Sequence, residues 1–160
     1  MAGGEGESTK KRAMVAIDES ECSHHALDWA LANLRDSLSS PLIIFTVQPL
    51  QSISILAAAS YGSPAPELIR SVQEHQQKVS VALLEKAKEI CSERGVVAET
   101  ITEVGDPKEA ICQAVEKFDV NLLILGNQGK GTLQRAFLGS VSNYCVHNAK
   151  CPVLVVKKSE

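Results

Sequence analysis

The stretch Val120-Asn-Leu-Leu-Ile-Leu-Gly-Asn-Gln-Gly129 places an apolar run directly before two glycines. A short apolar run bounded by turn residues is typical of a buried strand, here residues 120–125. Glycine at a strand end lets the backbone turn sharply and approach a bulky anion, because no β-carbon blocks the way. The stretch therefore predicts a strand that ends beside a ligand, with Gly126 and Gly129 in the turn.

A third glycine, in Gly139-Ser140, follows after nine intervening residues. Glycine inside a helix costs about 1 kcal/mol relative to alanine, so we expect Gly139 at the start of a helix over 139–148. The free N–H groups of a first helical turn, with the hydroxyls of Ser140 and Ser142, are suited to binding phosphate. The order of strand, glycine turn and helix start predicts a nucleotide site. Replacing Gly126 or Gly139 with a bulky residue is expected to abolish binding and leave the fold intact. The alternative is that these glycines only form loops and that Ser140 only caps a helix, without a ligand.

Two common phosphate-binding motifs are absent. Gly129-Lys-Gly-Thr132 looks like the end of a P-loop, but Gly131 separates the lysine from the threonine. The G-x-G-x-x-G fingerprint of dinucleotide folds is missing, and the glycine turn lies near the C-terminus rather than after the first strand.

The spacing of Gly126, Gly129, Gly139 and Ser140 is G-x2-G-x9-G-S, which resembles the ATP-binding signature of the universal stress protein family. Other segments resemble that family's opening strand, its Gly-Asp-Pro turn and its closing strand: Ala13-Met-Val-Ala-Ile-Asp18-Glu-Ser20, Val104-Gly-Asp-Pro107 and Cys151-Pro-Val-Leu-Val-Val156. The resemblance covers about residues 10–158 and is closest to plant single-domain members. The chain departs from the pattern at Asn127-Gln128, where members often carry a hydroxyl residue and then a basic one.

The resemblance implies an adenine-nucleotide site for ATP, ADP or AMP, with Mg²⁺ arriving only with the nucleotide. It assigns the ribose and phosphates to Gly126, Gly129, Gly139 and Ser140, with helix-terminal contacts from Val141 and Ser142. It places Ala16, Ile17 and Asp18 beside the nucleoside and the backbone of Val47 at the adenine. Lys130 or Arg135 supplies a positive charge, unless these side chains are only solvated. The alternative for Asp18 is a loop or helix-capping carboxylate.

Along the chain, predicted strands alternate with predicted helices. The strands are expected at 13–18, 41–47, 96–103, 120–125 and 152–157, and the helices at 20–38, 65–94, 107–117 and 139–148. Ser20 and Asp106 are expected helix caps, and Pro107 is suited to a first helical position. Residues 48–64 are too long for a simple connection and are expected to be functional or mobile. The alternation predicts an α/β domain with a parallel sheet and right-handed crossovers.

The resemblance implies an open, twisted five-stranded sheet in the order 3-2-1-4-5, with helices on both faces. This is a Rossmann-like architecture of the adenine nucleotide alpha hydrolase-like type. The first and fourth strands are then neighbours, and ligands of such sheets bind where the strand order reverses, outside the carboxyl ends. Asp18 and Gly126, more than a hundred residues apart, are therefore expected to meet at one crevice.

Composition limits the remaining choices. The 160 residues predict one domain over 13–158, preceded by a disordered tail over 1–12. A net charge of −3 and 4% aromatic residues argue against a nucleic-acid surface. No apolar run approaches the roughly 18 residues of a membrane helix. The chain has five cysteines, an odd number, which fits reduced thiols. A cytoplasmic location is therefore expected, and a nuclear location is the alternative. The histidines form no metal-binding pattern.

Three function classes remain: a nucleotide-binding stress-response or signalling module, an enzyme that cleaves ATP or transfers adenylyl groups, and an interaction protein without a nucleotide. The intact glycine signature favours the first. No catalytic residue is identified, so at most a slow ATPase is expected. The closing strand, 152–157, is apolar on both faces yet lies at a sheet edge. An exposed apolar edge needs pairing, which predicts a homodimer through this strand.

Overall fold

The structure, a computed structural model, describes residues 10–49, 66–128 and 134–158, without the side chains of 128 and 134–139. Five parallel strands form one sheet in the order β3-β2-β1-β4-β5, as expected. The strands are β1 (Ala13–Ala16), β2 (Leu42–Pro49), β3 (Ala98–Gly105), β4 (Leu122–Gln128) and β5 (Val153–Lys158). The registers place Met14 beside both Ile43 and Leu123, so β1 lies at the centre of the sheet.

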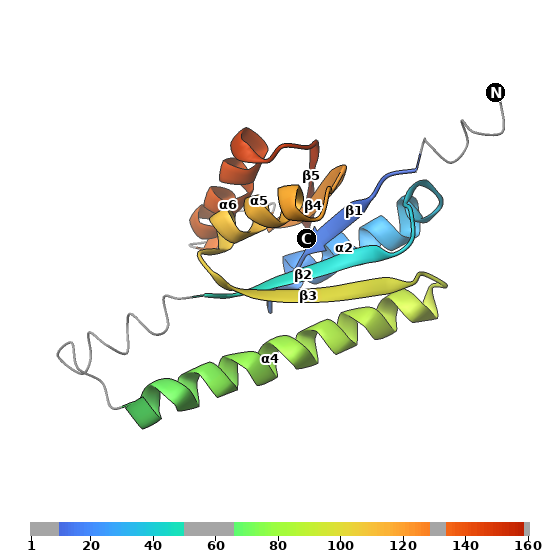
Figure 1. The fold of residues 1–160 in the computed structure, drawn as a ribbon. Coiled ribbons are helices and arrows are strands. Elements are labelled where there is room, and N and C mark those ends of the chain that lie inside the picture. Colours follow the sequence, from blue (N-terminus) through green and yellow to red (C-terminus); the bar gives the residue numbers. More distant parts are fainter. Residues whose placement is uncertain (1–9, 50–65, 129–133, 159–160) are drawn as a thin grey trace.

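Helices cover both faces of the sheet (Figure 1). The helices are α2 (Glu21–Asn33), α4 (Pro66–Glu93), α5 (Pro107–Lys117) and α6 (Gln134–Asn148), with a short 3₁₀ helix at Arg35–Ser37. Alternate residues of β1 belong to different cores because successive strand side chains point to opposite faces. Val15 packs in the core with α2 and α4, whereas Met14 packs in the core with α5 and α6. Both side chains are fully buried.

Local sequence signals determine two helix starts. Helix α5 begins at Pro107 after the N-cap Asp106, as the sequence predicts. Helix α2 begins after Ser20, whose hydroxyl accepts a hydrogen bond from the backbone N–H of Ser23 at 3.4 Å. The helix expected to reach residue 38 ends at Asn33, and the chain continues as the 3₁₀ turn.

Two predictions about the glycine-rich region are wrong. Helix α6 begins at Gln134, so Gly139 lies inside the helix and not at its start. The residues before it are ordinary helix formers, and their propensity offsets the roughly 1 kcal/mol that one internal glycine costs. Strand β4 continues to Gln128, so Gly126 is not the strand end; it pairs with Val156 of β5. Gly129 and Lys130 lie outside the described residues.

The domain contacts start before the expected boundary at Ala13. The N–H of Lys11 donates to the carbonyl of Ser37 at 2.9 Å. Arg12 donates through Nε to the carbonyl of Phe118 at 2.6 Å, and through its backbone N–H to Oδ1 of Asn121 at 3.1 Å. These contacts attach residues 11 and 12 to the folded domain, whereas residues 1–9 of the expected tail lie outside the described part of the chain. The expected long connection lies there too, apart from residues 48 and 49, which extend β2.

Candidate nucleotide site

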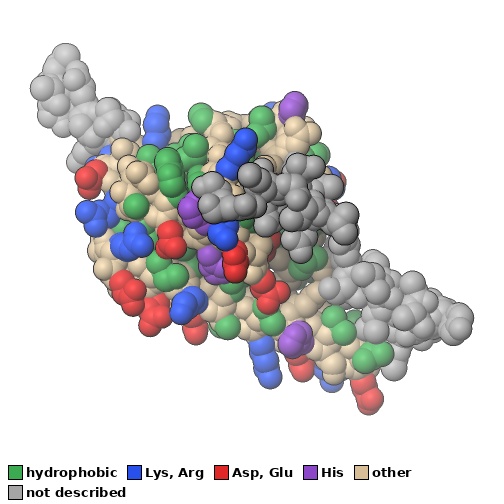
Figure 2. Space-filling view, turned by 180° about the vertical axis from the view of Figure 1, so that it is seen from behind, with side chains coloured by type: hydrophobic (Ala, Val, Ile, Leu, Met, Phe, Trp, Pro, Cys, Tyr) green, Lys and Arg blue, Asp and Glu red, His purple; other side chains and the backbone are tan. Residues whose placement is uncertain are grey.

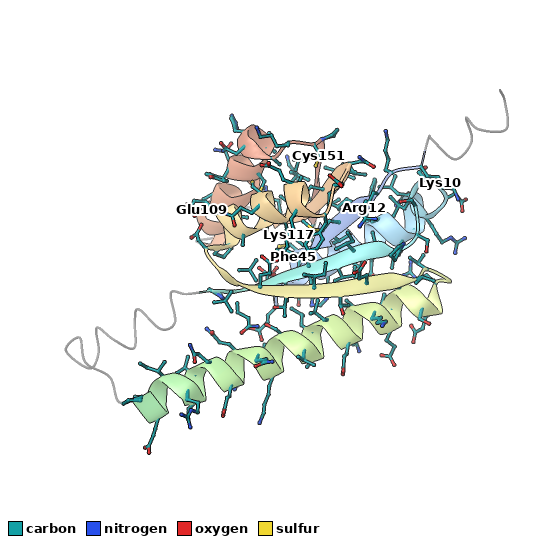
Figure 3. All side chains as sticks on the ribbon, in the orientation of Figure 1. Lys10, Arg12, Phe45, Glu109, Lys117 and Cys151 are labelled. Atoms are coloured by element: carbon teal, nitrogen blue, oxygen red, sulfur yellow. The ribbon has the colours of Figure 1, made fainter. Side chains whose placement is uncertain are left out.

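A cavity of about 250 Å³ lies at the carboxyl ends of β1, β2 and β4. These strand ends face the side of the molecule where Glu109, in the first turn of α5, lies, opposite Lys10 and Arg12 (Figure 3). The first residues of α2 and α5 and two residues of α6 complete the wall. The lining residues are Ala16, Ile17, Asp18, Ser20, Cys22, Ser23, Phe45, Thr46, Val47, Pro49, Pro107, Ile111, Leu125, Gly126, Val141 and Ser142.

Seven of the expected site residues lie on this wall. They come from the end of β1, from β2, from β4 and from α6: Ala16, Ile17, Asp18, Val47, Gly126, Val141 and Ser142. Asp18 and Gly126, distant in sequence, therefore meet at one cavity between the adjacent strands β1 and β4. Ser140 lies on α6 with an exposed side chain. Arg135 and Gly139 also lie in α6, within residues 134–139, whose side chains are not described.

Gly126 contacts the start of α2. A β-carbon at position 126 would lie 2.6 Å from the carbonyl carbon of Cys22 and 2.9 Å from the Cα of Ser23. Both atoms are backbone, so a side chain could fit only if the first turn of α2 moved. The glycine is needed where helix and strand approach each other. The expectation that a bulky residue at 126 leaves the fold intact is therefore wrong.

Asp18 is a loop carboxylate ahead of α2, one of the alternatives that the sequence left open, and it also lies on the cavity wall. Its Oδ1 accepts hydrogen bonds from the backbone N–H of Ser20 at 2.9 Å and from the Ser20 hydroxyl. Its Oδ2 has no such partner in the described part of the chain. The side chain is exposed, so Oδ2 can accept a hydrogen bond from a ligand. The two roles of Asp18 are therefore compatible.

The rest of the lining is mainly apolar. Phe45, Val47, Ile111, Leu125 and Val141 provide the large apolar surfaces. A few hydroxyl groups and the Asp18 carboxylate interrupt them, and Asp18 is the only charged side chain of the described wall. An apolar cavity with a few fixed polar groups is the usual form of a small-molecule site. It is suited to a flat heterocycle with polar substituents.

Sequence reasoning missed Ser23 and Thr46, both of which are buried on the cavity wall. Thr46 directly precedes Val47, and Ser23 lies in the first turn of α2, so both sit beside residues that were expected. Pro107 and Ile111 were recognised only as parts of α5. The position of α5 could have indicated Pro107 and Ile111, because α5 starts at the same edge of the sheet where β1 and β4 end.

The structure contains no group of three or more His, Cys, Asp or Glu residues, among those described, that could hold a metal ion. All five cysteines are free, and four of them are buried. The sulfurs of Cys112 and Cys145 are 3.9 Å apart, a proximity that the sequence did not indicate. Burial raises the pKa of the Cys145 thiol to about 12, so this thiol is protonated at neutral pH.

Positive and negative side chains are interspersed over the face shown in Figure 2. No helix within the described ranges is long and apolar enough to cross a membrane.

Comparison with known proteins gives a consistent result. A model of the universal stress protein family matches residues 10–157. A universal stress protein A-like protein of Arabidopsis thaliana is 30% identical, with 95% of this chain and 93% of the relative covered. The universal stress protein YxiE of Bacillus subtilis is 34% identical, with 91% and 98% covered. The crystal structure of an Arabidopsis thaliana universal stress protein with AMP bound superimposes with a TM-score of 0.68. It is 29% identical, and 93% of this chain and 92% of that one are covered.

Proposed function

The chain belongs to the universal stress protein family, and on that basis we propose that it binds an adenine nucleotide in the cavity between β1 and β4. The observation that carries the proposal is the position and lining of this cavity. It lies where the strand order reverses, which is where open α/β sheets bind their ligands. The AMP bound by the Arabidopsis relative supports the choice of an adenine nucleotide.

We assign the nucleoside part of the ligand to the described cavity. Its volume of about 250 Å³ is slightly below the roughly 300–1,000 Å³ of typical small-molecule sites. The apolar surfaces of Val47, Ile111 and Val141 suit an adenine ring. The Oδ2 of Asp18 can accept a hydrogen bond from a ligand, and the nucleoside offers ribose hydroxyls and the adenine amino group as donors. Phosphate oxygens are acceptors, so they belong elsewhere in the site.

We assign the phosphates to the segment between Gly126 and Ser142. Gly126, Gly129, Lys130 and Ser140 remain the proposed contacts from the glycine signature, and Gly139, inside α6 and without a side chain, would let a phosphate approach the helix. The start of α6 at Gln134 changes the role of Val141 and Ser142. These residues lie inside the helix, where backbone N–H groups are bonded to carbonyls one turn earlier, so their contacts come from side chains. Mg²⁺ would enter with ATP or ADP, because no metal cluster is formed by the described residues.

We propose a nucleotide-dependent role in stress response or signalling, in the cytoplasm, rather than metabolic catalysis. Turnover of ATP requires a positioned water and a group that stabilises the transition state. Among the described lining residues, Asp18 is the only charged one, and its Oδ1 is occupied by Ser20. We expect ATP hydrolysis to be far slower than the roughly 10 s⁻¹ of a typical enzyme, and a steady-state assay at that level would contradict this.

We further propose a homodimer through β5. This strand is at the edge of the sheet, and its pairing with β4 leaves the other side without a neighbouring strand in the described structure. Val153, Leu154 and Val155 are only partly buried, so pairing with a second copy would cover apolar surface. Sedimentation should show a dimer at micromolar concentration, and a monomer there would refute this part of the proposal.

The binding proposal is tested by titration calorimetry with AMP, ADP and ATP. GMP is the matched control, because it keeps the ribose and phosphate and changes the base. We expect binding of the adenine nucleotides and at least about fivefold weaker binding of GMP, since one mismatched polar group in a buried site costs about 1–3 kcal/mol. Failure of all three adenine nucleotides to bind would refute the proposal.

A further inference from the structure

One peptide group on the cavity wall is hydrogen-bonded to side chains at both ends. The carbonyl of Ile17 accepts from Oγ1 of Thr46 at 2.7 Å. The N–H of Asp18, which belongs to the same peptide group, donates to Oγ of Ser23 at 3.1 Å. Thr46 comes from β2 and Ser23 from α2, so two separate elements hold the end of β1. We call Ser23 and Thr46 the peptide clamp.

The clamp is buried although it borders the cavity. Thr46 is 3% exposed and Ser23 is 5% exposed. The Ser23 hydroxyl is also within 3.0 Å of the Asp18 carbonyl and 3.1 Å of the Ser20 carbonyl, either of which can accept its proton. Hydrogen bonds shielded from water hold their geometry better than exposed ones. The peptide plane before Asp18 is therefore fixed from both sides.

The clamp determines which groups of Asp18 face a ligand. The Asp18 N–H and the Ile17 carbonyl are both occupied, and the Asp18 Oδ1 is bonded to Ser20. Of the Asp18 carboxylate, only Oδ2 has no hydrogen-bond partner in the described part of the chain, and Asp18 is one of the residues that line the cavity. A carboxylate whose backbone is already fixed loses little conformational entropy on binding, and this improves affinity without any direct contact.

We propose that Ser23 and Thr46 are positioning residues for nucleotide binding, which act by fixing the Ile17–Asp18 peptide and thereby aiming Oδ2 of Asp18 at the nucleoside. This inference rests on the proposed function. Ser23 and Thr46 are thereby added to the residues of the site. They need not touch the ligand, because their effect passes through Asp18.

Calorimetry with AMP on hydroxyl-deletion variants tests the proposal. Thr46→Val and Ser23→Ala each remove a hydroxyl with little change of volume. We expect each to weaken AMP binding about three- to tenfold, the effect of one hydrogen bond. Thr46→Ser retains the hydroxyl and should bind AMP nearly as the wild type does. Ser80→Ala is the matched control, since Ser80 is also a buried serine but lies on α4, outside the cavity wall, and should leave affinity unchanged.

A double-mutant cycle separates positioning from a general structural role. If the clamp acts through Asp18, Thr46→Val and Ser23→Ala should each change affinity less than about twofold in an Asp18→Ala background. Equal effects in both backgrounds, or no effect in either, would overturn the proposal.

Amide hydrogen exchange provides a readout without ligand. The Asp18 N–H should be protected in the wild type and should exchange faster in Ser23→Ala, while Ser80→Ala leaves it unchanged. An unprotected Asp18 N–H in the wild type would also overturn the proposal. If the wild type bound no AMP, the proposed function itself would fail and the binding role of the clamp with it. AMP binding with additive variant effects would refute the clamp alone.

Discussion

The turn from β1 to α2 and the segment from β4 to α6 meet at the same cavity but are built differently. Residues 17–23 form a short turn in which Asp18, Ser20 and Ser23 bond to one another and to the backbone. On the other side of the cavity, β4 continues past Gly126 to Gln128, and the next described residue is Gln134, the first of α6. The first region is fixed by side-chain hydrogen bonds, and the second depends on a glycine that allows close packing.

This difference suggests a division of labour within the site. The β1–α2 turn presents a fixed carboxylate oxygen, which is suited to hydrogen-bond donors of the nucleoside. The β4–α6 segment carries the glycine signature, which is suited to phosphates. Variants in the first region should therefore weaken adenosine and AMP equally. Variants at the proposed phosphate contacts of the second region, such as Ser140, should weaken AMP and spare adenosine.

The largest effect is expected at Gly126, the contact between the two regions. Gly126→Ala should lower the free energy of unfolding by about 3 kcal/mol or more, because its β-carbon would overlap the backbone at Cys22 and Ser23. Gly105→Ala is the control: there a β-carbon would be 3.8 Å from the nearest side-chain atom, an ordinary contact. Chemical denaturation measures both, and equal stability of the two variants would contradict the described packing of α2 on β4.

The next effect is expected at Asp18. Asp18→Asn should weaken adenosine and AMP by the same factor, about tenfold, because it removes a charged acceptor from the nucleoside. Calorimetry with both ligands measures the two factors. A loss confined to AMP would place Asp18 at the phosphate and contradict the division between the regions.

A smaller effect is expected on the other side of the site. Ser140→Ala should weaken AMP by about 1 kcal/mol, the contribution of one hydrogen bond, and leave adenosine unchanged. Calorimetry with AMP and with adenosine measures the two changes in affinity. Equal weakening of both ligands would assign Ser140 to the nucleoside.

The smallest effect at neutral pH concerns Cys145 on α6. Its pKa is raised from 9.0 to about 12, primarily by burial, so folding favours the neutral thiol. Its contribution to stability is complete below pH 9 and is lost as the pH rises toward 12, because the unfolded chain ionises first. Thermal unfolding from pH 8 to 11 should show a steeper loss of stability for the wild type than for Cys145→Ala. Parallel curves would contradict the raised pKa.

Much of the fold could be predicted because its signals are local. Apolar runs gave the strands, and Asp106-Pro107 gave the start of α5 at the right residue. The strand order came from the resemblance and is confirmed. The end of β4 and the start of α6 were predicted wrongly, because Gly126 was interpreted as the end of a strand and Gly139 as the start of a helix. The requirement for Gly126 comes from α2, more than a hundred residues away, and no local pattern carries that information.

The candidate site was predicted unevenly for the same reason. Asp18 and Val47 were expected from the resemblance, and both lie on the cavity wall. The clamp residues Ser23 and Thr46 were not found, because their role depends on the distance between β2, α2 and the end of β1. Buried hydroxyl residues in a strand or a first helical turn are common in sequences, and only the packed structure shows what they bond.

Nitrogen-15 NMR titration with AMP tests the central claim most directly, because it reports binding and its location together. The account predicts saturable shifts in the amides of Ile17, Asp18, Val47, Gly126 and Ser142, at the ends of β1, β2 and β4 and in α6. The amides of Glu85 to Glu93, in the C-terminal part of α4, should not move. An absence of shifts, or shifts concentrated on α4, would contradict the account.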